Sequence, residues 1–212
     1  MALSDAELAR RNTVMLRNAN TLSKRVPMAL QKEQRTLARE VQRRQYADND
    51  VKALGLLYEY VDRVMSLAKG TIACKRGCAT CCHAEIALWQ PEADLIAAKI
   101  GVPARRLERD SSRYGTPYTT TKAPCPFLVN GACSIYAHRP LACRTMVNFD
   151  VDSTVCQFEH RDSTPVPMIN RTSTFAGVYE ALNIIIERNG GGAGDIREFF
   201  GETVDFSASR TT

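Results

Sequence analysis

The chain has 212 residues, of which 44% are hydrophobic and 24% are charged, and it carries a formal net charge of +5. This composition is ordinary for a soluble globular protein, and the length suits one good-sized core with an added arm. No apolar run approaches the roughly 18 residues that a membrane span needs, and the N-terminus has no apolar segment of the kind found in secretory signals. We therefore expect a cytoplasmic protein without membrane contact, in which thiols stay reduced.

The positive charge is concentrated in the N-terminal part of the chain. The first 50 residues carry ten Lys or Arg against six Asp or Glu, which accounts for +4 of the net +5. We interpret residues 1–48 as a basic helical arm whose residues 24–44 could engage a nucleic acid or a protein partner. Arg35, Arg39 and Arg43 would form one stripe there, although a solvated helix face is the commoner role of such a stripe.

Sequence patterns predict helices through most of the chain. A capping box formed by Ser4 and Glu7 predicts the first helix, and Pro27 predicts the start of the second. The most regular pattern follows, with apolar residues at three- and four-residue spacing: Val51, Leu54, Tyr58, Val61, Met65 and Ala68. The predicted helices span residues 5–19, 27–46, 51–69, 91–100, 103–112, 172–188 and 195–200.

The segments between these helices are rich in turn-forming residues. We expect a short extended piece at residues 86–90 and a loop or mobile lid at residues 111–123. We also expect a proline-rich linker at residues 162–170, a flexible glycine-rich break at residues 189–194 and a disordered tail at residues 203–212. The predicted fold class is therefore mainly α. It consists of a helical domain, residues 49–202, with long irregular metal-binding loops, preceded by the helical N-terminal arm.

Eight cysteines carry the strongest chemical signal, and they form two groups. The first group lies within nine positions and the second is more widely spaced: Cys74, Cys78, Cys81 and Cys82, then Cys125, Cys133, Cys143 and Cys156. A disulfide framework is disfavoured in a chain of this size in a reducing compartment. Thiolates are soft ligands that suit zinc and iron–sulfur clusters. We therefore interpret all eight as candidate metal ligands.

The spacing within the first group suits a loop that wraps around one metal. Cys74-x₃-Cys78-x₂-Cys81 places three sulfurs on a short segment, and Gly77 supplies the conformational freedom that a tight wrap requires. Cys82 is harder to place because adjacent side chains tend to diverge, so it could serve a second metal, bridge two metals or face the core. With one short C-x₂-C pair, the chain does not fit an ordinary zinc ribbon.

Basic residues and histidines stand beside the cysteines. A cofactor bound by thiolates would carry negative charge. Four neighbouring basic residues could offset this charge, or they could be plain surface residues: Lys75, Arg76, Arg139 and Arg144. The three histidines are His83, His138 and His160. We expect each to lie outside the ligand set or on the surface, although His83 could complete a Cys₃His site.

The two cysteine segments together resemble a known family. The pattern C-x₃-C-x₂-C-C at residues 74–82 and the pattern CPFL…CSIY-x₂-RP-x₂-CR at residues 125–144 resemble the YkgJ-type cysteine-cluster family, a zinc- or iron-chelating domain. The resemblance covers residues 70–160 and implies a bound metal. The chain is also similar in its cysteine cluster to the flagellin lysine N-methylases, which implies that an iron–sulfur centre is credible.

These observations leave three function classes open. The first is a metal-binding protein that holds an iron–sulfur cluster, for example a 4Fe-4S cluster, or else zinc. The second is a cluster-dependent protein-modifying enzyme of the methylase kind, although no Ser/His/Asp set, H-E-x-x-H motif or nucleotide loop is visible. The third is a structural or assembly protein that a metal ties together while its basic arm binds nucleic acid or a protein.

Overall fold

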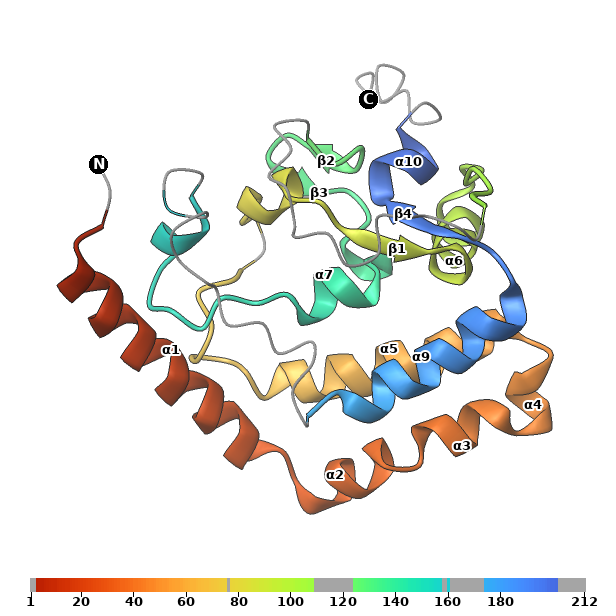
Figure 1. Ribbon diagram of the computed structural model, residues 1–212, viewed down its shortest axis with the longest axis horizontal. Coiled ribbons are helices and arrows are strands. Elements are labelled where there is room, and N and C mark those ends of the chain that lie inside the picture. Colours follow the sequence, from red (N-terminus) through yellow and green to blue (C-terminus); the bar gives the residue numbers. More distant parts are fainter. Residues whose placement is uncertain (1–2, 76, 109–123, 158–159, 161–173, 202–212) are drawn as a thin grey trace. The chain divides into compact units, whose positions relative to one another are not determined.

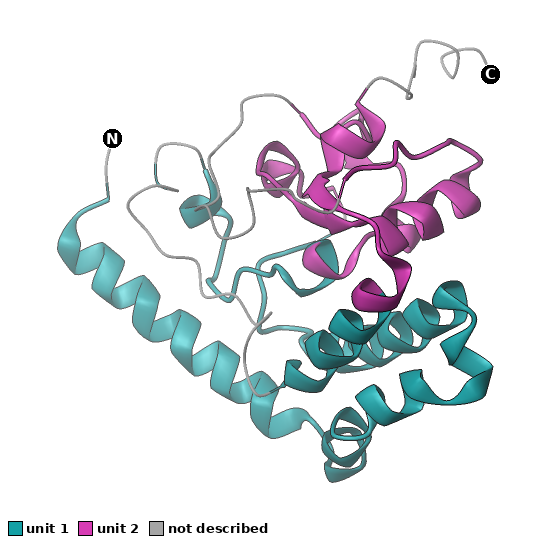
Figure 2. Ribbon diagram, turned by 45° about the vertical axis from the view of Figure 1, so that its right-hand side comes forward, with its two compact units in different colours: residues 1–75, 143–185 teal, residues 76–142, 186–212 magenta. Residues whose placement is uncertain are grey.

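The computed structural model describes residues 3–75, 77–108, 124–157, 160 and 174–201. The described chain is mainly helical, with four short strands in two small sheets (Figure 1), which confirms the predicted fold class. It forms two compact units (Figure 2). The first unit contains residues 1–75 and 143–185, and the second contains residues 76–142 and 186–212.

The first helix of unit 1, α1 (Asp5–Arg25), begins where the capping pattern predicts and ends six residues later than predicted. The Ser4 hydroxyl accepts a hydrogen bond from the Glu7 N–H at 3.3 Å, which satisfies one free donor of the first turn. The carboxylate of Glu7 instead binds Arg10 and Arg11. Basic residues in the last turn suit the helix dipole there, so the helix extends past the predicted end.

The prediction of one continuous helix over residues 27–46 is wrong. The structure has three short helices there: α2 (Met28–Gln34), α3 (Leu37–Gln42) and α4 (Arg44–Ala47). The Thr36 hydroxyl donates to the Glu33 carbonyl at 2.9 Å, a side-chain bond that competes with helix continuation. Arg43 is extended, with ψ 146°. Arg35, Arg39 and Arg43 therefore do not follow one another along a single helix.

The central helix of unit 1 is α5 (Asp50–Ser66), whose first turn is capped by the Asn49 side chain. Most of the predicted stripe is buried, but Val51 is 45% exposed. The buried face is also wider than predicted and includes Leu57, Tyr60 and Val64. The reason is that α5 has neighbours on two sides (Figure 1): the Tyr60 hydroxyl donates to the Leu30 carbonyl of α2, and its ring meets that of Phe175, just before α9 (Ala176–Asn189), edge-on at 6.5 Å.

In unit 2, strand β1 (Ala87–Trp89) pairs antiparallel with β4 (Ala193–Asp195), and α6 (Gln90–Ile100) and α10 (Ile196–Phe200) follow these strands. The flexible break predicted at residues 189–194 is therefore wrong. A side chain at Gly192 would place its Cβ 1.9 Å from the Glu108 carbonyl oxygen, so this glycine permits close backbone approach. The end of this glycine-rich segment, Ala193 and Gly194, belongs to strand β4.

The remaining strands of unit 2 are β2 (Leu128–Val129) and β3 (Ala132–Cys133), which form a hairpin. Asn130 and Gly131 make the turn with φ of 49° and 72°, as Asn-Gly turns do. No helix forms at residues 103–108, where backbone groups bond instead to the Gln90 side chain and the Phe199 carbonyl, so that prediction is wrong. The end of that predicted helix, residues 109–112, lies outside the described residues. The same holds for the predicted loop at 111–123, the predicted linker at 162–170 and the predicted tail at 203–212.

The core of each unit is made of large apolar side chains. In unit 2, the rings of Phe127 and Phe200 meet at 5.0 Å, which joins the hairpin to α10. Each fully buried Leu or Phe contributes roughly 1.5–3 kcal/mol. Among the described residues, no helix is both long and apolar enough to cross a membrane.

Two helical glycines of unit 1 give a matched test of its packing. A Cβ at Gly177 would lie 2.1 Å from the Gln34 carbonyl oxygen, whereas a Cβ at Gly55 would meet nothing within 4 Å. We expect Gly177→Ala to lower the free energy of unfolding by about 1–3 kcal/mol. We expect Gly55→Ala to raise it by about 0.5–1 kcal/mol. Urea unfolding of both variants measures this, and equal effects would contradict the close packing of α9 on α2.

Candidate metal centre

Unit 2 brings two cysteine segments together. Cys81 and Cys82 lie on a 3₁₀ helix (Thr80–His83), and Cys125 and Cys133 flank β2 of the hairpin. The Cys125 N–H donates to the Cys82 carbonyl at 2.7 Å. This backbone bond joins segments that are separated by 43 positions in the sequence, so the thiols they carry are near neighbours.

The ionisation of Cys82 shows how closely these thiols gather. A hydrogen bond with the Cys81 side chain, burial, and the nearby thiols of Cys81, Cys125 and Cys133 all raise the pKa of Cys82 well above its ordinary value. Like charges close together disfavour ionisation. The expectation that the side chains of Cys81 and Cys82 diverge does not hold, and four thiols of unit 2 interact.

Backbone N–H donors oppose the rise in pKa at two of the four thiols. Burial raises the pKa of Cys125 to about 11, and an N–H bond from Phe127 acts against the rise. Burial likewise raises the pKa of Cys133, and the Ile135 N–H acts against it. In both cases the donor is the second residue after the cysteine. Such bonds favour the thiolate, the form that binds metal.

The predicted basic residues have different surroundings. The charge of Arg139 acts to lower the pKa of Cys133, and its guanidinium lies 3.7 Å from the centre of the Tyr136 ring. In unit 1, Arg144 is buried and pairs with Asp62 at 2.6 Å. Lys75 is exposed, and Arg76 lies outside the described residues. Their predicted role beside a cofactor stays a prediction.

Arg197 of α10 was missed by the sequence analysis. Its charge acts to lower the pKa of Cys125, and it donates hydrogen bonds to backbone carbonyls of both cysteine segments. The one local signal is the capping box of Asp195 and Glu198, which fixes the start of the helix. A capping box does not reveal which distant segment the next side chain contacts.

Unit 1 holds the other cysteines of the second group and Cys74. The Cys74 sulfur accepts a hydrogen bond from the Asn148 N–H at 3.2 Å, and the Ala73 N–H donates to the Asn148 carbonyl at 2.8 Å. Cys143 lies on α7 (Leu141–Thr145), and Cys156 ends a 3₁₀ helix (Thr154–Cys156). Both are partly buried.

A loop fixed by its own side chains supports Cys74. The Asn148 side chain accepts from the Asp150 N–H and donates to the Asp152 carbonyl. The Arg11 guanidinium of α1 binds the carboxylates of Asp150 and Asp152 at 2.5 and 2.8 Å. Asp150 is fully buried as a side chain, so this ion pair holds the N-terminal helix against the loop that carries Asn148.

The remaining predicted ligands have plainer surroundings. Cys78 is partly exposed and follows Gly77, whose φ of 86° confirms that a glycine is needed in this tight loop. His83 and His138 are partly exposed, and His160 is buried. The structure describes all eight cysteines, and none of them forms a disulfide. Within the described residues, no three Cys, His, Asp or Glu side chains are arranged to hold a metal ion.

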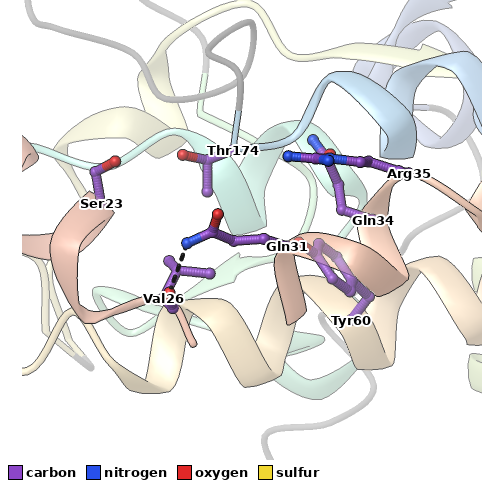
Figure 3. Close-up of a pocket in the computed structure, with 7 residues that line it drawn as sticks. All are labelled: Ser23, Val26, Gln31, Gln34, Arg35, Tyr60 and Thr174. Carbon is purple, nitrogen blue, oxygen red and sulfur yellow. Dashed lines mark hydrogen bonds between the residues drawn. The ribbon is translucent and has the colours of Figure 1, made fainter. Parts of the chain in front are cut away.

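A polar pocket of about 260 Å³ in unit 1 contains none of the cysteines (Figure 3). It lies in the basic region of the predicted arm, and one of its side chains, Gln31, donates to the Val26 carbonyl at 2.9 Å. Its lining residues are Ser23, Val26, Gln31, Gln34, Arg35, Tyr60 and Thr174.

Comparison with protein families confirms the resemblance inferred from the cysteine pattern. Residues 73–164 match the CxxCxxCC family, described as a "Putative zinc- or iron-chelating domain". The matched segment contains all eight cysteines. No curated protein and no solved structure matches the chain. Residues 73–164 thus match a domain model whose description supports a metal cofactor and names zinc and iron as the candidates.

The Arg11 ion pairs predict a large effect of one substitution. Arg11→Met would leave the buried carboxylate of Asp150 without its cation, which costs about 3–5 kcal/mol when a buried pair is broken. Arg10→Met is the matched control, since Arg10 is exposed and, among the described residues, forms its ion pair with Glu7; we expect a loss of about 0–1 kcal/mol. Urea unfolding at pH 7 measures both, and equal losses would contradict the anchoring role of Arg11.

The same ion pairs predict a pH dependence. The hydrogen bond from Arg11 holds the pKa of Asp152 well below its usual value, and Arg10 and Arg11 lower the pKa of Glu7 to about 2. A depressed pKa stabilises the fold above the ordinary value and ceases to do so as the pH falls through the folded-state value. We expect the stability difference between wild type and Arg11→Met to narrow below about pH 4. A difference that is constant from pH 6 to pH 2 would contradict this.

Proposed function

We propose that the protein binds a metal cofactor through its cysteine thiolates, and that this cofactor is an iron–sulfur cluster. The observation that carries the proposal is the backbone hydrogen bond from Cys125 to Cys82, which joins the two segments of unit 2 that carry Cys81, Cys82, Cys125 and Cys133. Four thiolates are the usual ligand set of both 2Fe–2S and 4Fe–4S clusters.

The surroundings of these thiols fit a negatively charged thiolate centre. The thiols are partly buried, which limits access of water. N–H groups of Phe127 and Ile135 donate to two sulfurs, and Arg139 and Arg197 contribute positive charge. Hydrogen bonds to sulfur and nearby charge tune the reduction potential of a cluster. When bound, an iron–sulfur cluster supplies one-electron redox chemistry, and these residues would hold and shield it.

The number and spacing of the cysteines argue against an ordinary zinc ribbon. A structural zinc ribbon uses four ligands in two short C-x₂-C pairs, whereas this chain has eight cysteines and one such pair. Beyond the four interacting thiols there remain Cys78 in unit 2, and Cys74, Cys143 and Cys156 in unit 1. Zinc is the alternative cofactor.

Anaerobic purification with analysis of iron, acid-labile sulfide and zinc tests the proposal. We expect a brown protein with a broad visible absorption band and with iron and sulfide in stoichiometric amounts, because thiolate-to-iron charge transfer absorbs visible light. A colourless protein with stoichiometric zinc would overturn the iron–sulfur assignment. A protein that binds neither metal after reconstitution would overturn the metal-binding function as a whole.

Cysteine variants test which thiols are used. We expect Cys125→Ser and Cys133→Ser each to lose the metal of unit 2, because serine replaces a soft thiolate with a hard hydroxyl that rarely binds zinc or iron–sulfur centres. Cys156→Ser is the matched control, the same chemical change in unit 1. Metal content and absorption spectra are the measurements. Full metal content in Cys125→Ser, or loss of all metal in Cys156→Ser, would contradict the proposed ligand set.

A further inference from the structure

We propose that Arg197 is the positioning residue that holds the two cysteine segments of unit 2 together for metal binding. This inference rests on the proposed metal-binding function and adds to it a residue outside the cysteine motifs and outside the matched segment 73–164. Its basis is the set of hydrogen bonds that one guanidinium makes to the backbone on both sides of the site.

The guanidinium contacts both cysteine segments at once. On the first segment, Nη2 donates to the Cys82 carbonyl at 3.1 Å, and both terminal nitrogens donate to the Ala84 carbonyl at 3.2 Å. On the second segment, Nε donates to the carbonyl of Pro124, the residue before Cys125, at 3.2 Å. The Cys82 carbonyl also accepts the Cys125 N–H, so Arg197 reinforces the bond that joins the segments.

Asp195 fixes the guanidinium in this position. Its carboxylate accepts from Arg197 Nη1 at 2.8 Å and from the Arg197 N–H at 2.9 Å. The same carboxylate accepts the Ile86 N–H at 2.7 Å, just after the first cysteine segment. Both side chains are largely buried, with 16% and 11% exposed. The clamp is therefore preorganised by the start of α10 and by strand β4.

The geometry requires an arginine. Its planar fork offers five N–H donors in fixed directions, whereas a lysine has one compact ammonium group. Here the fork serves three carbonyl oxygens and a carboxylate together. Lys at position 197 would keep the positive charge but could not span both segments, so Arg197→Lys separates the effect of geometry from that of charge.

The test compares Arg197→Ala and Arg197→Lys with wild type and with the matched control Arg106→Ala. Arg106 is an exposed arginine of the same unit, and it contacts Asp94 and the Asn189 carbonyl. The first measurement is the affinity for Zn²⁺, titrated against a chelator into the reduced metal-free protein. The second is amide hydrogen exchange of the metal-free protein in peptides that contain residues 82–86 and 124–128.

We expect both Arg197 variants to bind Zn²⁺ at least about tenfold more weakly, as is typical when a residue that orients metal ligands is lost. We also expect faster exchange in the two peptides, since the Cys125 and Ile86 amides lose their support. Arg106→Ala should match wild type in both measurements. These readouts move together only if Arg197 positions the ligands.

Several results would overturn the inference. Unchanged Zn²⁺ affinity in Arg197→Ala would reduce Arg197 to a general structural residue, even if exchange were faster. Wild-type affinity in Arg197→Lys would show that charge suffices without the fork. If wild type binds neither Zn²⁺ nor reconstituted iron, the proposed function fails and this inference fails with it, whereas normal wild-type binding with unaffected variants overturns the inference alone.

Discussion

The backbone hydrogen bond from Cys125 to Cys82 is the contact on which the thiol arrangement of unit 2 depends. It joins a 3₁₀ turn to the base of a hairpin, and neither element is long enough to be stable alone. The contact between the rings of Phe127 and Phe200 holds the hairpin against α10. The antiparallel pairing of β1 with β4 holds the 3₁₀ turn, which directly precedes β1. Small irregular elements can thus hold these thiols in place because strands and helices on either side fix them.

Gathering thiols has an electrostatic cost, which the chain partly offsets. Burial and mutual proximity favour the protonated form of these cysteines, whereas metals bind the thiolate. The N–H groups of Phe127 and Ile135 and the charge of two arginines oppose this tendency. A bound cation would supply the largest compensation. Ionisation of these thiols and binding of a metal would therefore favour each other.

Some local features could be predicted from the sequence, whereas the long-range pairings could not. The Ser4 cap and the need for Gly77 depend on neighbouring residues, and both predictions were confirmed. The pairing of β1 with β4 joins residues more than 100 positions apart, and glycine content alone suggested flexibility there. Likewise, the cysteine motifs indicated the candidate ligands, but no motif could place Arg197, because its partners come from two other segments.

The ion pairs of Arg11 with Asp150 and Asp152 have a consequence for how the chain folds. They connect residues separated by 139 and 141 positions, and unit 1 is itself discontinuous in sequence. During synthesis α1 emerges early, but the loop that it anchors is made much later. Contacts of such high sequence separation slow folding. The ion pairs that hold α1 therefore cannot form until the loop beyond Cys143 has been made.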